Sequence, residues 1–261
     1  MSVMKMRFSG PARVIFAIGA ALALPAVSSA QVRVIISGGF AAAYREVVPE
    51  FERTTGITVT TASGASQGTG PDTIAAMLRR GEPADVVIMN RSGLAELIAQ
   101  GKIAPGTDLN LAETLIGVAV RSGTPRPDFT TVETFRQMLL RAKTVAVPGS
   151  TASRFTEIVK KLGISSQIEL KIPGRGTESV AMVARGDAQL SIQPVSEILH
   201  MPGVELAGTI PTDLQYREVF VAAIIAGSKQ AEASQRLIAF LSSEHTAATI
   251  KKSGMEPSRQ R

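Results

Sequence analysis

Short apolar segments alternate with amphipathic segments of helical length along most of the chain. Residues 32–37, 56–62 and 84–90 are predicted strands, and residues 40–54 and 92–102 are predicted helices. Strand and helix in regular alternation imply right-handed crossovers between parallel strands. The pattern therefore predicts an α/β fold built on mainly parallel sheets.

Single residues add local detail to this pattern. Pro49 should bend the first helix, because proline removes a backbone donor there. Asp72 is predicted to cap the helix that follows it, and Gly81 to end that helix. Thr151 is the predicted cap of a later helix.

The middle of the chain changes character after a strand near 114–121, which runs into a proline-rich turn. A second long strand is predicted over 216–225. If both strands cross between two lobes, the first lobe holds residues 31–117 plus 220–261. The second lobe then holds residues 118–219.

Residues 1–30 have the pattern of a secretory signal peptide. Basic residues precede an apolar core over 14–24, which is too short to span a bilayer comfortably. Ser28 and Ala30 stand at the small-residue positions of a cleavage site. We expect export to a bacterial periplasm with Gln31 as the new N-terminus; a retained N-terminal anchor is the alternative.

Composition excludes several classes of function. Three of the charges in the formal +6 lie in the signal segment, which leaves 6 − 3 = +3. With no Trp and 4% aromatic residues, nucleic-acid binding is not expected. Cysteine is absent, which removes thiol chemistry. His200 and His245 are isolated from one another, so neither a metal site nor a cofactor is expected.

The turn Ser37-Gly38-Gly39 joins the first strand to the first helix. Other predicted strands also end in small-residue turns that open helices. Helix N-termini present free N–H groups and a positive dipole end, and ligands of open α/β sheets lie at the carboxyl ends of strands. These turns predict an anion site.

The segments "FERTTGITVT" (51–60) and "RRGEPADVVIMNRSGLAELIAQGKI" (79–103) carry a family resemblance. Together with the Ser/Gly turn and the export signal, they resemble the molybdate-binding type of periplasmic solute-binding protein. The resemblance implies the type II periplasmic binding protein fold, and we expect a monomer. Each lobe is then a mixed, mainly parallel sheet flanked by helices, and two hinge crossovers join the lobes. It also implies a small anionic ligand and delivery to the membrane subunits of an ABC transporter.

The resemblance further implies contact loops that hold the ligand with hydroxyl and backbone N–H groups. Carried onto this sequence and joined to the residues at the strand ends, the predicted ligand-binding set is Ser37, Gly38, Gly39, Ser63, Ser66, Asn90, Arg91, Ala152, Ser153, Arg154, Ser179, Val180 and Gln193.

The chain departs from the family near "SIQPVSE", where Gln193 and its neighbours replace the typical tyrosine. Arg91 and Arg154 stand at strand-to-helix turns, and a guanidinium fork suits a carboxylate. Arg175 is a weaker third candidate. These arginines favour a di- or tricarboxylate over a metal oxyanion, with solvated rim charges as the alternative. Arginines pointing away from the cleft would argue against the carboxylate.

Two enzyme interpretations compete with capture of an anion for import, which the sequence favours. Residues 64–68 match G-x-S-x-G, but a further loop follows Ser66, so a hydrolase elbow is not expected. Aconitate isomerases also resemble this family. Their chemistry needs carboxylate anchors and a proton-transfer group, for which Glu178 and Glu197 are the candidates.

Overall fold

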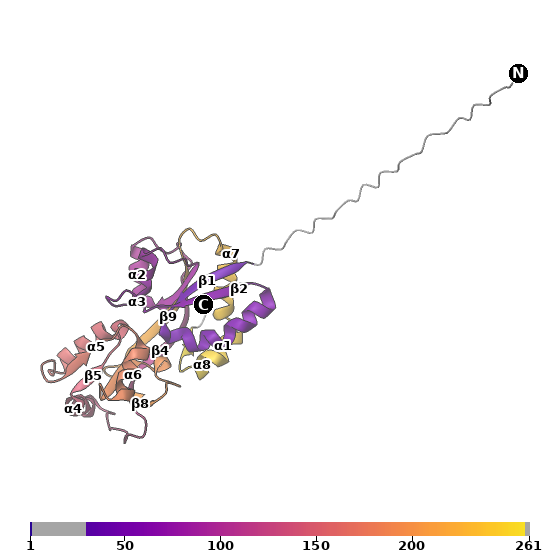
Figure 1. The fold of residues 1–261 in the computed structure, drawn as a ribbon. Coiled ribbons are helices and arrows are strands. Elements are labelled where there is room, and N and C mark those ends of the chain that lie inside the picture. Colours follow the sequence, from indigo (N-terminus) through magenta and orange to yellow (C-terminus); the bar gives the residue numbers. More distant parts are fainter. Residues whose placement is uncertain (2–29, 259–261) are drawn as a thin grey trace.

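The structure, a computed structural model, describes Met1 and residues 30–258. Figure 1 shows two lobes, one made by both ends of this part of the chain and one by its middle. The two-lobed α/β fold is as the sequence predicts. The predicted signal peptide lies outside the described residues, apart from Met1 and Ala30.

The first lobe is built on three parallel strands, β1, β2 and β3, with β9 antiparallel to β3. Its elements are β1 (Gln31–Ile36), α1 (Gly38–Thr55), β2 (Thr58–Ser63), α2 (Ile74–Arg79), β3 (Val86–Asn90), α3 (Arg91–Ala99), β9 (Arg217–Ile224), α7 (Ala231–Leu241), η2 (Glu244–Thr246), α8 (Ala247–Lys252) and β10 (Glu256–Pro257).

The second lobe repeats the plan, with β5, β6 and β7 parallel to one another. Its elements are α4 (Val132–Ala142), β5 (Thr144–Ala146), α5 (Gly149–Lys161), β6 (Glu169–Lys171), α6 (Gly176–Arg185), β7 (Leu190–Pro194), η1 (Val195–Glu197) and β8 (Val204–Thr209).

Strand β4 (Leu109–Arg121) belongs to both lobes. Its residues up to Leu115 pair with β9, and from Ile116 onward it pairs with β7 and β8. The chain returns to the first lobe before β9, because β9 pairs with β3 and with the first-lobe part of β4, residues 109–115. The exact lobe limits stay a prediction, but the pairing places a crossing at Leu115–Ile116.

Each sheet is covered on both faces, which explains the nearly continuous apolar strands. All five residues of β3 are buried. Phe40 and Phe51 of α1 pack on one face of the first-lobe sheet, while Leu94 and Leu97 of α3 pack on the other. Phe135 and Phe155 fill the second-lobe core. Burial of this apolar surface is the main stabilising term of each lobe.

Three predictions concern single residues at or within helices. Pro49 lies inside α1, which continues to Thr55, and the bend at Pro49 stays a prediction. The Asp72 prediction is wrong, because Thr73 caps α2 by accepting from the Ala76 N–H. The Thr151 prediction is also wrong: α5 begins at Gly149, and Thr151 is fully buried inside it.

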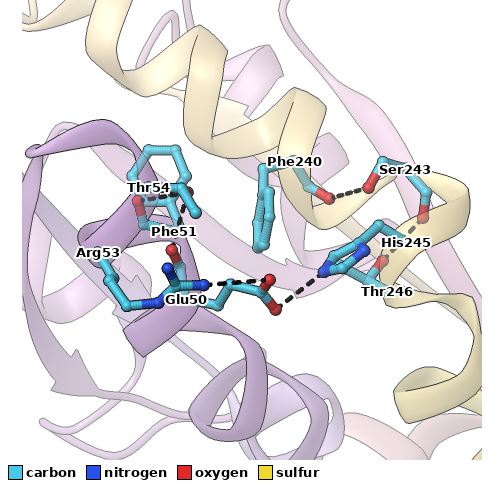
Figure 2. Close-up of polar contacts among 8 residues, drawn as sticks. All are labelled: Glu50, Phe51, Arg53, Thr54, Phe240, Ser243, His245 and Thr246. Atoms are coloured by element: carbon cyan, nitrogen blue, oxygen red, sulfur yellow. Dashed lines mark hydrogen bonds and ion pairs between the residues drawn. The ribbon is translucent and has the colours of Figure 1, made fainter.

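His245 takes part in packing between α1 and η2, as Figure 2 shows. Its Nε2 lies 2.8 Å from Oε2 of Glu50, whose pKa is lowered by that contact. Its ring lies 5.8 Å from the ring of Phe240, which in turn lies 5.5 Å from Phe51. His245 thus has a structural role on the surface of the first lobe.

No helix in residues 30–258 is long and apolar enough to cross a membrane.

Candidate functional site

A cavity of about 200 Å³ lies between the lobes, at the carboxyl ends of β1 and β2. Residues of both lobes form its wall, in agreement with the expected place of a ligand in an α/β fold. The wall consists of Ser37, Gly38, Ala41, Ala42, Arg45, Ser63, Gly64, Ala65, Ser66, Ser150, Gly174, Arg175, Gly176, Thr177, Ser196, Glu197, Leu199, His200 and Met201.

Two helices begin at this cavity. Ser37 is extended and precedes α1, whose first turn contains no acidic residue. Gly176 begins α6, which leaves the second lobe from the opposite side. The first N–H groups of each helix have no partner inside the helix, and the helix dipoles add positive potential. The cavity is therefore suited to negative charge.

Three buried polar atoms of the cavity wall have no hydrogen-bond partner among the described residues. They are the hydroxyls of Ser37 and Ser196 and Oε2 of Glu197. A larger depression of about 1100 Å³ lies over α7 and α8, and its described wall contains none of the orphaned atoms. Because native proteins pair nearly all buried polar groups, the smaller cavity is the better candidate site.

Glu197 lies between the starts of the two helices. A Cβ added to Gly176 would fall 1.8 Å from Oε2 of Glu197, and one added to Gly38 would fall 3.3 Å from Oε1. Both glycines thus leave the space that the carboxyl group occupies. The group sits where the potential of two helix N-termini converges.

The Glu197 carboxyl group has an unusual acidity. Burial, and next the charge of Glu218, raise its pKa to about 7. Burial likewise raises the pKa of Glu218 to about 7, although Arg154 and Asn90 act in the opposite direction. Two interacting carboxyl groups that titrate near neutrality can hold one proton between them. Such a pair can both accept and donate a proton at physiological pH.

A polar cluster supports Glu218 at the junction of the lobes. The Arg154 guanidinium lies 4.6 Å from the centre of the Tyr216 ring, a cation–π contact. The Tyr216 hydroxyl is buried without a partner among the described residues, and burial raises its pKa well above the ordinary value. The positive charge of Arg154 lowers the pKa of Glu218 and so partly offsets the effect of burial on that carboxyl group.

A buried hydrogen-bond chain fixes the backbone of Glu197. Gln193 Nε2 donates to the Glu197 carbonyl at 3.0 Å, and Ser191 Oγ donates to Gln193 Oε1 at 3.3 Å. The hydroxyls of Ser191 and Ser179 are 2.8 Å apart. The chain holds η1 in place while leaving the carboxyl group unpaired.

Arg175 joins the lobes across the cavity. Its Nε donates to Oδ2 of Asp72 at 2.5 Å, and its Nη2 donates to the Ser63 carbonyl at 3.1 Å. Arg175 comes from the second lobe, while Asp72 and Ser63 belong to the first. These interactions hold the half-exposed Arg175 guanidinium in the wall of the cavity.

The predicted binding residues divide into two groups. Ser37, Gly38, Ser63 and Ser66 line the cavity, and Glu197 lines it as well. The other predicted residues lie outside the cavity wall: Gly39, Asn90, Arg91, Ala152, Ser153, Arg154, Glu178, Ser179, Val180 and Gln193.

Several of the outer residues have evident structural roles. A Cβ on Gly39 would fall 1.8 Å from the Phe220 ring, so this glycine permits close packing. Asn90 caps α3 by accepting from the Gly93 N–H. Arg91 Nη1 donates to Asp108 Oδ2 at 2.5 Å, so its guanidinium is already paired. The inference of a carboxylate from Arg91 and Arg154 therefore loses its basis, because Arg91 is paired with Asp108 and Arg154 lies over the Tyr216 ring, outside the wall. Arg175 does line the wall, where it is paired with Asp72.

Sequence reasoning missed Arg45, Glu218 and Tyr216. Arg45 lies one turn after Ala41 on the cavity face of α1, which a helical projection from Gly38 can find. Glu218 is an acidic residue within an apolar strand, a recognisable but ambiguous signal. Residues 30–258 bring together no group of three or more acidic or histidine side chains that could hold a metal ion.

The chain is similar to known proteins along most of its length. Residues 32–256 match the model of a family described as bacterial extracellular solute-binding protein. An aconitate isomerase from Pseudomonas sp. is 35% identical over 227 residues, which cover 86% of this chain and 87% of that protein.

Solved structures with the same fold are more distant in sequence. The periplasmic molybdate-binding protein of Azotobacter vinelandii matches with a TM-score of 0.66 at 17% identity, covering 88% of this chain and 100% of that one. The sulfate-binding protein SubI of Mycobacterium tuberculosis matches with a TM-score of 0.72 at 18% identity, covering 87% of both chains. Such likeness establishes the fold, while function depends on the site.

Proposed function

The chain belongs to the bacterial extracellular solute-binding protein family, and we propose that it binds a small unsaturated polycarboxylate between its lobes and isomerises it. The reaction is a proton shift of the kind that interconverts the aconitate isomers. Export to the periplasm, with cleavage after Ala30, is part of the proposal.

The cavity favours a small organic anion. Its volume of about 200 Å³ lies below the range of roughly 300–1,000 Å³ that is usual for drug-sized ligands. Helix N-termini and the Ser37 and Ser196 hydroxyls supply donors for carboxylate oxygens, and Arg175, although paired with Asp72, adds positive charge to the wall. These groups hold the carboxylates and leave the carbon skeleton facing Glu197.

The proton shift needs one group that removes and returns a proton. The ionised Glu197 carboxylate takes a proton from the methylene carbon beside the double bond. The resulting charge spreads over three carbons and the attached carboxylates, where helix N-termini and Arg175 stabilise it. Glu197 then returns the proton to the other end of the three-carbon unit, and the double bond moves. A pKa near 7 suits both steps.

The unpaired Glu197 carboxyl between two helix N-termini is the observation that carries this proposal. A site that only captures an inorganic oxyanion gains nothing from a carboxyl group in its wall, since like charges repel when the group ionises. The relation to an aconitate isomerase along most of both chains supports the same conclusion.

A second candidate is capture of the same polycarboxylate for an ABC importer. The family membership and the interlobe cavity favour it, because closure of two lobes around a solute presents a defined surface to membrane subunits. In that case the ligand leaves unchanged.

The test is incubation of residues 31–261 with trans-aconitate in D₂O, followed by proton NMR. Isomerisation predicts formation of cis-aconitate, with a new deuterium label wherever the proton on Glu197 exchanges with solvent before it is returned. Binding without conversion, seen as a rise in melting temperature with unchanged spectra, would overturn the isomerase in favour of import. Saturating ligand at about a hundredfold its Kd stabilises a protein by roughly 2.7 kcal/mol, a readily measured shift.

A further inference from the structure

The wall of the cavity contains one cation that the proposed mechanism does not use. Arg45 lies on α1 and lines the cavity beside Ala41 and Ala42. Among the described residues its guanidinium has no ion pair and no side-chain hydrogen bond. Arg175, by contrast, already binds Asp72. Arg45 is an exposed side chain, and among the described residues of the wall it is an arginine without an ionic partner.

The surroundings of Arg45 leave room for a ligand group. Gly38, Ala41 and Ala42 present almost no side-chain volume on the same helix face. His200 lines the cavity from the second lobe and has a left-handed backbone with φ 65°. Residues other than Gly adopt that conformation uncommonly, although His does so more often than most, and it recurs at functional sites.

Charge is distributed unequally in the cavity. Glu197 lies where α1 and α6 begin, and Arg45 lies two turns along α1 from that point. A ligand whose reacting carbon faces Glu197 and whose remaining groups extend along α1 brings those groups toward Arg45. An acidic group at that place meets a guanidinium fork, which matches carboxylate geometry.

We propose that Arg45 is a specificity-determining residue that binds an additional carboxylate of the ligand and so selects tricarboxylates over dicarboxylates. This inference rests on the proposed polycarboxylate site, and it adds the residue that distinguishes ligands with three carboxylates from ligands with two. Arg45 binds and orients the ligand, while Glu197 moves the proton.

The test compares unreactive ligands that differ by one carboxylate. Isothermal titration calorimetry measures Kd for propane-1,2,3-tricarboxylate, glutarate and methylsuccinate, of which the last two each lack one carboxylate of the first. Arg45→Gln should weaken the tricarboxylate by about tenfold or more. At least one dicarboxylate should stay within about twofold, because its complex never used Arg45.

Arg53→Gln is the matched control, because Arg53 lies on the same helix, outside the cavity wall, beside Glu50. It should leave all three affinities unchanged, and both variants should melt like the wild type. A tricarboxylate affinity unaltered in Arg45→Gln, or an equal loss for all three ligands, would overturn the inference.

The same experiment separates this inference from the proposed function. If Arg45→Gln shows the selective loss but the wild type leaves aconitate unchanged, only the isomerase proposal fails. If aconitate is isomerised and Arg45→Gln binds as the wild type does, only the role of Arg45 fails. A wild type that binds none of the three acids overturns both.

Discussion

Asp85 and Glu197 are two acidic side chains with buried carboxyl oxygens, and they differ in hydrogen bonding and in the direction of their pKa shift. Asp85 accepts from the backbone N–H of Arg33, from Nε and Nη2 of the same residue, and from Ser228 Oγ. Burial alone would raise its pKa, but these bonds hold the pKa below the ordinary value. Glu197 Oε2 has no partner among the described residues, and its pKa is raised to about 7.

The difference separates a structural carboxylate from a reactive one. The Asp85 network links β1, the start of β3 and the loop before α7, so it stabilises the first lobe. Glu197 is held only through its backbone, by Gln193. An unpaired buried carboxyl group destabilises a fold, and such groups occur where chemistry needs them.

The largest expected effect on stability is the loss of the structural carboxylate. Asp85→Asn should lower the free energy of unfolding at pH 7 by about 3 kcal/mol, because it leaves the Arg33 and Ser228 donors poorly matched. Urea denaturation measures this loss. Because the folded-state pKa of Asp85 is lowered, the wild type begins to lose the same stabilisation as the pH falls below about 4, and the two proteins should converge once the pH is below that lowered pKa. A variant as stable as the wild type at pH 7 would show that Asp85 contributes nothing.

Replacement of the reactive carboxyl should have the opposite sign. The folded-state pKa of Glu197 is raised, so its ionisation destabilises the wild type progressively from about pH 4.5 to 7. Glu197→Gln should therefore be more stable by on the order of 2 kcal/mol at pH 8 and equal to the wild type near pH 4.5. Urea denaturation at both pH values measures the difference.

The half-exposed Glu113, which pairs with Arg217, provides the control for this pH dependence. Glu113→Gln should stay within about 0.5 kcal/mol of the wild type at both pH values. A Glu197→Gln variant that is less stable than the wild type at pH 8 would contradict the contrast with Asp85.

The smallest effect is expected at the half-exposed pair between the lobes. Asp72→Asn removes the charge opposite Arg175, and surface pairs contribute at most about 1 kcal/mol. The melting temperature should change little, while small-angle scattering should detect any opening of the lobes. A loss as large as that of Asp85→Asn would place this pair among the structural carboxylates.

The sequence predicted the fold better than the site, for physical reasons. Apolar strands such as β3 are buried on both faces and leave a clear pattern, so the α/β order follows from the residues. The helix caps failed where two candidates stood side by side, as Asp72 and Thr73 did. Asp72 instead faces Arg175 of the other lobe, 103 positions away in sequence.

Site residues depend on contacts that sequence alone does not reveal. Ser37 and Ser63 follow directly from their strands, and the structure places both in the cavity wall. Arg91 looked equally well placed, but Asp108 pairs with it. The pKa of Glu218 depends on its burial and on the charge of Arg154. Glu218 belongs to the first lobe and Arg154 to the second, so sequence alone does not bring them together. Charge pairing across the lobes is a tertiary property.

The most direct test of the account is the isomerisation rate of Glu197→Gln with trans-aconitate in D₂O, followed by proton NMR. Glu178→Gln is the matched control, because Glu178 is exposed at the start of α6 and outside the cavity wall. We predict that Glu197→Gln loses activity by roughly 10²- to 10⁴-fold while it still binds the tricarboxylate, and that Glu178→Gln keeps the wild-type rate. A Glu197→Gln variant that isomerises aconitate and takes up deuterium at the wild-type rate would contradict the account.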